Sequence, residues 1–216
     1  ITDQVAEEIQ LRSETTTPII VLNNPSVSFD GIVTNKPKIL GFSFCGNVGR
    51  FQRVPLILDA IETYFKRGGR LEFHFAVGGL YANHLKKFSV KFPRFHYHGM
   101  VSSTEAAQIN ANYTWALLTI EDEVTRFAFP SRLSSYVYSG ANILAVCGER
   151  TSVAQYVNAN RVGLVVKPDM EAIIKSFFEI EKGSTQDLSQ TEPRDALKAG
   201  LSFEAFVETL DRVVFA

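Results

Sequence analysis

From residue 38 onward, short apolar runs rich in β-branched and aromatic residues alternate with stretches that have the period of an amphipathic helix. We expect strands in six such runs, at residues 39–45, 71–77, 94–98, 114–119, 142–146 and 162–166. Helical spacing separates them, most clearly at 55–66 and 103–111. Runs such as ILGFSFC and ANILAVC are apolar throughout, which is typical of strands buried on both faces. Strands and helices that alternate with right-handed crossovers predict an α/β fold: a doubly wound, mostly parallel, Rossmann-like sheet with helices on both faces.

Local signals support these helices. Ser102 and Glu105 have the spacing of a capping box, and Lys66 and Arg67 precede Gly68 as a basic last turn followed by a glycine stop. Outside the alternating region, residues 1–14 predict a short helix, 19–22 a β-branched strand and 25–37 a polar linker. The end of the chain predicts exposed helices, the last with an apolar stripe of Phe203, Phe206, Leu210, Val213 and Val214.

Composition excludes several classes of protein. The 216 residues are 45% hydrophobic, which suits a globular protein with a sizeable core, and 22 Lys and Arg against 23 Asp and Glu give no basic field for nucleic acid. No apolar run approaches the roughly 20 residues that a membrane helix needs. Cys45 and Cys147 have no metal-binding spacing and are too few for a disulfide framework, so we expect a reducing, cytoplasmic location. The chain begins at Ile1 in mid-pattern, and we expect it to be a fragment.

Two segments are candidates for binding a diphosphate. In the first, Gly46 and Gly49 allow close approach of the backbone to a ligand, Asn47 lies between them, and Arg50 and Arg53 offer bidentate contacts to phosphate oxygens. An ordinary strand-to-helix turn with solvated arginines explains the same residues equally well.

In the second segment, Pro130 suits a first helical turn, and Ser131 and Arg132 would follow where the helix dipole and free amides favour an anion. A plain helix start with a solvated arginine is the alternative. Together, Arg53 and Arg132 are predicted to hold one diphosphate between two helix N-termini.

Other chemistry is less well supported by the sequence. There is no P-loop motif, and the second strand ends at Gly78 without the acidic residue that holds an NAD ribose. We interpret the acidic run 121–123 as a solvated turn rather than a metal or sugar site. Tyr97 and Tyr113 lie near strand ends, where a base can stack. The remaining candidates are the four histidines, which we expect to be packed or surface residues: His74, His84, His96 and His98.

The two candidate segments resemble motifs of a known family. GNVGRFQRVPLILDAIE resembles the G-N-x-G-x-x-Q segment, and FPSRLSSYVYSGANILAV the P-S-K-L-x-x-Y-x-x-x-G-x-P-V segment, of family 4-type, GT-B fold glycosyltransferases. Looser matches are HFAVGG, FHYHGMVSSTEAAQI and SVAQYVNANRVGLVVKPDMEAI. The resemblance covers nearly the whole chain but only the C-terminal half of such an enzyme.

This resemblance implies a domain that binds a nucleotide diphosphate sugar, usually a UDP-sugar, and retaining transfer to a glycan or polysaccharide without a metal or other cofactor. It divides the chain into the end of a missing N-terminal domain and a linker (1–37), the donor-binding domain (38–182), and an exposed linker with C-terminal helices (183–216). The acceptor, and the catalytic residues that this chain does not identify, would belong to the missing half. Two further interactions stay open: peripheral contact with a membrane surface through the missing half, and formation of a homodimer.

By position, the resemblance assigns residues to three parts of the donor. The diphosphate would contact Gly46, Asn47, Gly49, Arg53, Ser131 and Arg132. The nucleoside would lie near Gly78, Tyr97, His98, Gly99 and Ser135, and the sugar near Arg126 and Phe127. Two positions depart from the family, because Ser135 and Phe127 stand where many members have glutamates that bind the ribose and the hexose.

These departures keep alternatives open. The second hypothesis is a non-catalytic nucleotide-binding or protein-interaction domain on the same fold. A third, a nucleotide-sugar epimerase, is weaker because its acidic and histidine catalytic groups cannot be located.

Overall fold

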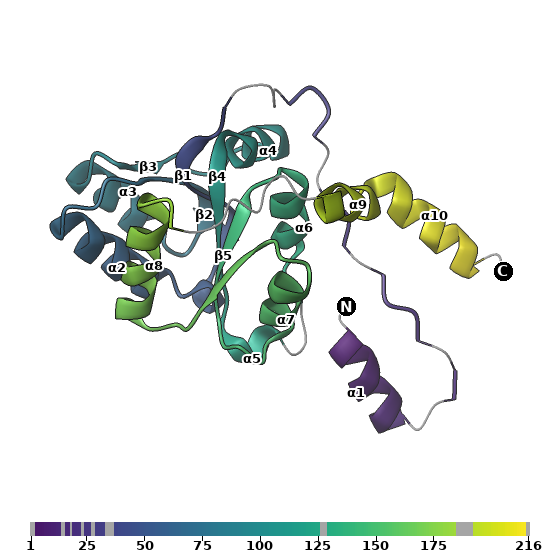
Figure 1. Ribbon diagram of the computed structural model, residues 1–216. Coiled ribbons are helices and arrows are strands. Elements are labelled where there is room, and N and C mark those ends of the chain that lie inside the picture. Colours follow the sequence, from purple (N-terminus) through teal and green to yellow (C-terminus); the bar gives the residue numbers. More distant parts are fainter. Residues whose placement is uncertain are drawn as a thin grey trace.

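A six-stranded sheet forms the centre of the computed structural model, which describes residues 3–13, 16–17, 19–22, 24–26, 29–32, 37–125, 129–184 and 192–214 (Figure 1). The strand order is β3-β2-β1-β4-β5-β6, and all five pairings are parallel. The strands are β1 (Ile39–Val48), β2 (Glu72–Gly79), β3 (Phe95–Tyr97), β4 (Tyr113–Thr119), β5 (Asn142–Val146) and β6 (Gly163–Val166). All six predicted strands are present, and the predicted doubly wound α/β fold is confirmed.

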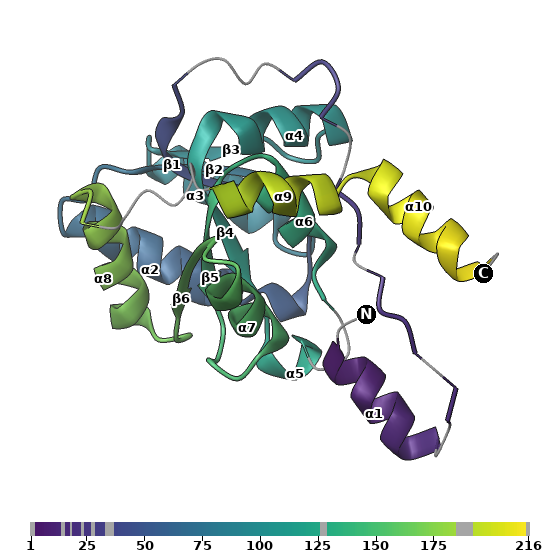
Figure 2. The same ribbon diagram turned by 45° about the vertical axis from the view of Figure 1, so that its right-hand side comes forward.

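Helices cover both faces of the sheet, which explains why the strands are apolar along their whole length. One face carries α2 (Val54–Lys66), α3 (Ala82–Lys91) and α8 (Met170–Glu181). The opposite face carries α4 (Ser103–Asn112), α6 (Ser131–Tyr138) and α7 (Ser152–Ala159) (Figures 1 and 2). Two short helices, η1 (Arg50–Gln52) and α5 (Asp122–Thr125), follow β1 and β4. A buried core therefore lies on each side of the sheet.

The core under α2 and α8 is aromatic. Phe73 stacks on Phe42 with ring centroids 5.2 Å apart, and Phe177 meets both rings edge-on. Tyr64 is fully buried beside them, and its hydroxyl donates to Glu181 at 2.5 Å. The same oxygen accepts the backbone N–H groups of Arg70 and Leu71 at 3.1 and 3.0 Å, so its polar atom is satisfied. This network holds the start of β2 against two helices.

Local signals predicted two helix ends correctly. Ser102 and Glu105 form the predicted capping box, with the Glu105 backbone N–H 3.2 Å from the Ser102 hydroxyl and the Ser102 N–H 2.9 Å from the Glu105 carboxylate. After α2 ends at Lys66, Gly68 has a φ of +90°, a backbone conformation that glycine adopts without steric cost.

Three predictions about boundaries were wrong. β1 runs on to Val48, because Gly46 and Asn47 pair with Val77 and Gly78 of β2 instead of entering a loop. Residues 19–22 are not a strand, since no neighbouring strand pairs with them in the part of the chain that is described. Pro130 precedes α6 as its N-cap and does not lie in the first turn.

The terminal helices lie outside the two cores. α1 (Asp3–Ser13), α9 (Glu192–Gly200) and α10 (Phe203–Val214) match the predicted helices, and α9 packs on α6. α10 projects away from the sheet (Figure 1), and its apolar stripe is solvent-facing, with Phe203 61% exposed and Val214 60% exposed. Among the described residues, no helix has the length and apolarity that crossing a bilayer requires.

Candidate functional site

The carboxyl end of β1 lies where the strand order changes direction, because β1 is flanked by β2 on one side and β4 on the other. In open parallel sheets this point opens a crevice beyond the strand ends, where ligands bind. Gly46, Asn47 and Gly49 lie there, together with the start of α2. The topology therefore brings the first candidate segment to the expected location.

Gly46 has the tightest constraint in this segment. Its φ is +112°, and a Cβ at this position would lie 3.5 Å from Nη2 of Arg132. The positive φ is what favours glycine here, since a Cβ at 3.5 Å would only make an ordinary contact with the arginine. Gly49 begins the short helix η1, and its N–H donates to Oε1 of Gln52 at 2.6 Å.

Arg132 comes from the first turn of α6 and lies across the end of β1. Its Nη2 donates to the Asn47 carbonyl oxygen at 2.5 Å, and the guanidinium lies 5.2 Å from the ring centroid of Phe44. Its Nη1 is buried and has no hydrogen-bond partner. No ion pair joins Arg132 to a described carboxylate. This arginine is thus positioned at the strand end with unused hydrogen-bonding capacity and an uncompensated charge.

Two buried groups lie beside Arg132. Burial raises the pKa of Tyr136 to about 12 against the lowering effect of the nearby guanidinium, and the Tyr136 hydroxyl accepts the backbone N–H of Cys45 at 3.2 Å. Burial also raises the pKa of the Cys45 thiol to about 12 and raises that of the Cys147 thiol. Both thiols are therefore protonated at neutral pH and do not supply a thiolate nucleophile.

Arg53 is placed differently from Arg132. It has a left-handed backbone with a φ of 45°, and its side chain, 16% exposed, points to the segment after β4. Its Nε donates to the Ile120 carbonyl at 3.1 Å, and its Nη2 pairs with Glu121 at 2.9 Å and with Asp122 at 3.0 Å. Two carboxylates therefore compensate the charge that was expected to face a diphosphate.

The acidic run 121–123 was interpreted as a solvated turn, and this interpretation was wrong for two of its residues. Glu121 and Asp122 pair with Arg53, and Asp122 also accepts the backbone N–H of Gly148 at 3.0 Å. Asp122 thus joins the loops that follow β1, β4 and β5. Sequence analysis missed this role, although an acidic run beside an arginine-containing loop is a signal of charge pairing.

The serines of α6 divide between surface and interior. Ser131 is exposed in the first turn, next to Arg132. Ser135 is 7% exposed and faces inward, and Ser134 donates its hydroxyl to the carbonyl of Asn24 at 2.6 Å. The helix N-terminus and Ser131 are accessible, whereas Ser135 is nearly enclosed.

Four of the five residues expected near the nucleoside lie at the carboxyl ends of β2 and β3, and the fifth, Ser135, lies on α6. Gly78 is buried, and a Cβ there would lie 2.5 Å from the terminal methyl of Met100. Tyr97 ends β3, His98 and Gly99 follow it, and Gly99 has a φ of +72°. Burial and the neighbouring His96 lower the pKa of His98, so its ring is neutral at pH 7. The ends of the paired strands β2 and β3 bring these four residues close together.

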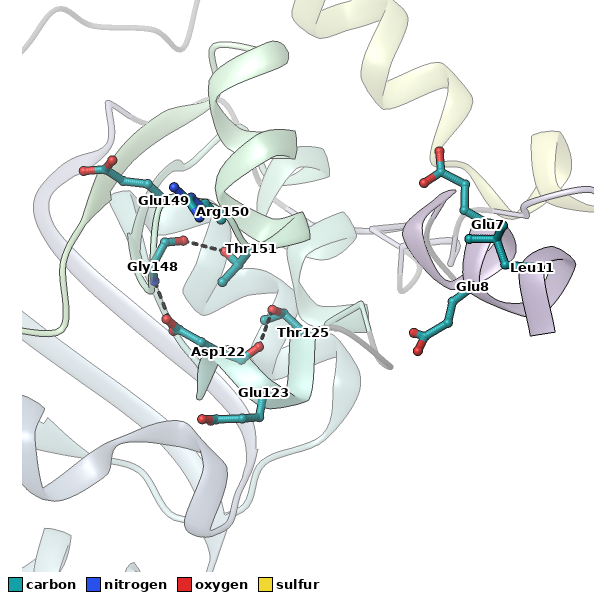
Figure 3. A pocket seen from close by; sticks show the side chains of 10 residues that line it. All are labelled: Glu7, Glu8, Leu11, Asp122, Glu123, Thr125, Gly148, Glu149, Arg150 and Thr151. Atoms are coloured by element: carbon teal, nitrogen blue, oxygen red, sulfur yellow. Dashed lines mark hydrogen bonds between the residues drawn. The ribbon is translucent and has the colours of Figure 1, made fainter.

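A cavity with a volume of about 740 Å³ lies beyond the ends of β4 and β5 (Figure 3). It is lined from three sides by α1, by α5 and by the loop before α7. Its lining residues are Glu7, Glu8, Leu11, Asp122, Glu123, Thr125, Gly148, Glu149, Arg150 and Thr151. The lining holds five carboxylates and one arginine, and three of the carboxylates pair with a cation: Glu8 with Arg12, Asp122 with Arg53 and Glu149 with Lys167. Arg126 and Phe127, the predicted sugar contacts, lie outside the described residues.

Comparisons with known proteins agree with this fold. No protein-family model matches the chain, and no curated protein matches its sequence. Solved structures do match, however. The chain is 11% identical to the GtfA/B complex over 96% of its length with a TM-score of 0.69, and 16% identical over 97% to the lipopolysaccharide outer core galactosyltransferase WaaB in its apo form, also with a TM-score of 0.69.

A third match is a mutant of S. aureus TarM solved with fondaparinux, alpha-GlcNAc-glycerol and UDP, which is 13% identical over 97% of this chain with a TM-score of 0.63. The chain covers only 42%, 58% and 42% of these three structures, or about half their length. The likeness establishes the fold: the chain has the Rossmann-like fold of GT-B glycosyltransferases, consistent with their C-terminal domain.

Proposed function

We propose that this chain is the donor-binding part of a retaining glycosyltransferase that uses a nucleotide diphosphate sugar, in the first instance a UDP-sugar. The observation that carries the proposal is Arg132, whose buried Nη1 has no partner and whose guanidinium lies against Gly46 at the switch point of the sheet. A cation with a free N–H at a helix N-terminus suits a phosphate oxygen. The TarM structure that shares this fold contains UDP, which supports the choice of nucleotide.

Gly46, Asn47, Gly49, Ser131 and Arg132 would surround the diphosphate. When the bond between sugar and phosphate breaks, negative charge builds up on the diphosphate, and fixed N–H donors stabilise that charge in the transition state. Arg132 and the first turn of α6 would supply this stabilisation without a metal. We assign Arg53 a supporting role, because Glu121 and Asp122 already pair with it.

The nucleoside would extend toward the ends of β2 and β3, near Gly78, Tyr97, His98 and Gly99, with Ser135 at the ribose position. The sugar would lie on the other side, toward the cavity beyond β4 and β5, where carboxylates can accept hydrogen bonds from its hydroxyl groups. We leave Arg126 and Phe127 as sugar contacts by resemblance. A glycan or polysaccharide acceptor would be held by a second domain, in a cytoplasmic protein.

The second candidate function is a nucleotide-binding or protein-interaction domain without transfer chemistry. The pairing of Arg53 with two carboxylates favours it, since this arginine is then less able to stabilise a leaving diphosphate. Both functions use the same cleft, and they differ in whether a bound donor is ever cleaved.

Calorimetric titration with UDP, GDP and UDP-N-acetylglucosamine tests the proposal. We expect saturable UDP binding that Arg132→Ala weakens by about 10- to 150-fold, which corresponds to about 1.5–3 kcal/mol for a hydrogen bond to a charged group. Arg212→Ala is the control, because Arg212 is an exposed arginine on α10, which projects away from the sheet and its strand ends (Figure 1). The donor site would be contradicted if the unmodified chain, Arg132→Ala and the control variant bound UDP with equal affinity, or if a folded sample bound no nucleotide.

A further inference from the structure

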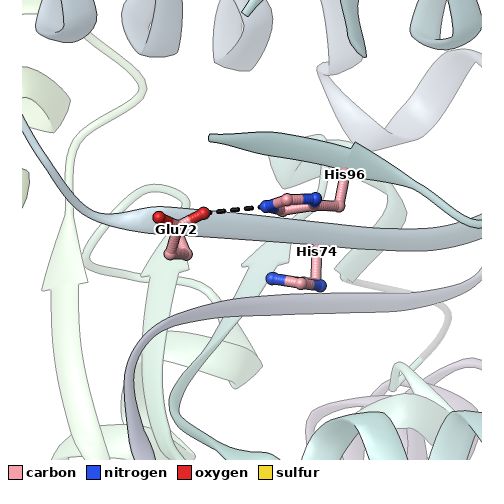
Figure 4. Close-up of side chains that lie close together, drawn as sticks. All are labelled: Glu72, His74 and His96. Atoms are coloured by element: carbon pink, nitrogen blue, oxygen red, sulfur yellow. Dashed lines mark hydrogen bonds and ion pairs between the residues drawn. The ribbon is translucent and has the colours of Figure 1, made fainter. Parts of the chain in front are cut away.

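Glu72, His74 and His96 lie together on one face of the sheet (Figure 4). His98, a candidate nucleoside contact just after β3, borders this cluster, with its Nε2 3.0 Å from Nδ1 of His74. His74 of β2 and His96 of the edge strand β3 are register partners, and their rings stack with centroids 4.2 Å apart. Glu72 precedes His74 by two residues and so lies on the same face. Its Oε2 lies 2.8 Å from Nε2 of His96.

From this geometry we propose that Glu72, His74 and His96 form a binding site for a divalent transition metal of the zinc, nickel and copper group. One ligand atom from each of the three side chains lies within 4.8 Å of the other two. All three side chains are half-buried, so they are accessible to an ion yet partly shielded from water. The inference does not depend on the proposed function.

The donor set matches this class of ion. Two imidazole nitrogens and one carboxylate oxygen are typical ligands of zinc, nickel and copper, and three protein ligands leave a fourth position for water. In a tetrahedral zinc site with bonds of about 2.0–2.2 Å, ligand atoms lie about 3.3 Å apart. His96 and Glu72 would separate slightly from their present 2.8 Å, and His74 would move inward by side-chain rotation.

Neighbouring side chains already orient two of the ligands. Arg94 Nη1 donates to the second oxygen of Glu72 at 2.7 Å, which turns Oε2 toward His96. Nε2 of His74 lies 2.8 Å from the Tyr113 hydroxyl, and Nδ1 lies 3.0 Å from Nε2 of His98. An ion bound at one of these nitrogens replaces the contact there, and the other contact then holds the ring. Partners of this kind around metal ligands fix ring orientation and strengthen binding.

Gly41 makes this arrangement possible. It lies on β1, between β2 and β4, and a Cβ there would be 3.3 Å from Cδ1 of the Tyr113 ring and 2.7 Å from the Glu72 carbonyl oxygen. Since Gly41 has no side chain, the Tyr113 ring reaches across β1 to His74. A bound ion would in turn join β2 to β3, an edge strand of only three residues.

Calorimetric titration of the EDTA-treated chain with zinc chloride tests the site. We expect one equivalent to bind, with affinity reduced at least tenfold in both His96→Gln and Glu72→Gln, the range for loss of a ligand or its support. His84→Gln is the matched control, because His84 is exposed on α3 and outside the cluster, and its affinity should be unchanged. Zinc at a hundredfold excess over Kd should raise the Tm by about 5 °C or more in the unmodified chain and in His84→Gln. The same zinc concentration should raise the Tm of the two cluster variants by less.

Three results would overturn the proposal: no saturable zinc binding, a zinc affinity in His96→Gln and Glu72→Gln equal to that of the unmodified chain, or an equally large loss of affinity in His84→Gln. Should Glu72→Gln fail to fold because Arg94 loses its partner, His96→Gln decides alone, since it alters a half-buried side chain on the edge strand. A cobalt titration gives an independent readout. A thiolate-to-cobalt charge-transfer band would assign the metal to Cys45 or Cys147 and contradict the site.

Discussion

The guanidinium of Arg53 connects the start of α2 to the segment that follows β4, and substitution Arg53→Ala removes all of its contacts. Three are lost: the hydrogen bond to the Ile120 carbonyl at 3.1 Å and the ion pairs with Glu121 at 2.9 Å and Asp122 at 3.0 Å. The Arg53 side chain is 16% exposed, so these contacts form largely out of water. We expect the variant to lose stability independently of any ligand.

The size of the loss follows from the exposure of the partners. The bond from the buried guanidinium to the Ile120 carbonyl contributes about 1.5 kcal/mol, the lower value for a charged hydrogen bond. Glu121 and Asp122 are 34% and 43% exposed and regain water when Arg53 is removed, so each pair contributes only about 0.5–1 kcal/mol. The total is about 3 kcal/mol, or a Tm lower by about 6–12 °C for a chain of this size.

Thermal and urea unfolding measured by circular dichroism check this value, with Arg50→Ala as a control of equal charge change. Arg50 is exposed, and its loss should change stability by less than about 0.5 kcal/mol. If Arg53→Ala and Arg50→Ala melt within about 1 °C of each other, Arg53 is not paired in solution, and its guanidinium would again be available to a diphosphate.

Two further predictions concern the core and the sheet. Burial raises the pKa of Glu181, but hydrogen bonds from Tyr64 and Arg70 outweigh it and hold the pKa below its usual value of 4.5. The charge of Glu181 therefore stabilises the fold above this pH, and its contribution to the free energy of unfolding disappears as the pH falls through the lowered folded-state pKa. We expect Glu181→Gln to be about 1–2 kcal/mol less stable than the unmodified chain at pH 7. Urea unfolding at a series of pH values should show this difference shrinking toward acid pH. In Gly163→Ala, the new Cβ would lie 1.9 Å from a carbonyl oxygen of β5, so we expect the free energy of unfolding to fall by about 3 kcal/mol, measured by thermal unfolding. Gly200→Ala is the control, because a Cβ at Gly200 faces open space and should leave stability unchanged. Equal melting of the two glycine variants would contradict the β5–β6 register.

The sequence was sufficient to predict the sheet because parallel strands buried on both faces have a strong signal. Runs of apolar residues between helical stretches leave few alternative arrangements once crossovers are right-handed. The end of β1 was harder to predict. Gly46 and Asn47 are typical turn residues, and only the neighbouring strand, which offers Val77 and Gly78 as partners, keeps them in the ladder.

The sequence placed the two candidate segments at strand ends and helix starts, but it did not indicate the charge pairing of Arg53. The strand ends bring the two candidate segments together because topology alone requires it. Which arginine is free depends on contacts between residues 69 positions apart, such as Arg53 and Asp122. The same is true of the histidine cluster, since the partnership of His74 with His96 requires the register of β2 and β3. The available signal was the two-residue spacing of Glu72 with His74.

A chain with a net charge of -1 attracts a nucleotide only where its charges are separated locally. At this edge of the sheet they are separated, because Arg132 and the N-terminus of α6 lie at the end of β1, while the carboxylates of the cavity lie beyond β4 and β5. Asp122 stands at the boundary, where its bonds to Arg53 and to the Gly148 N–H keep one carboxylate occupied. A ligand with negative charge in its middle and neutral hydroxyl groups at one end matches this division.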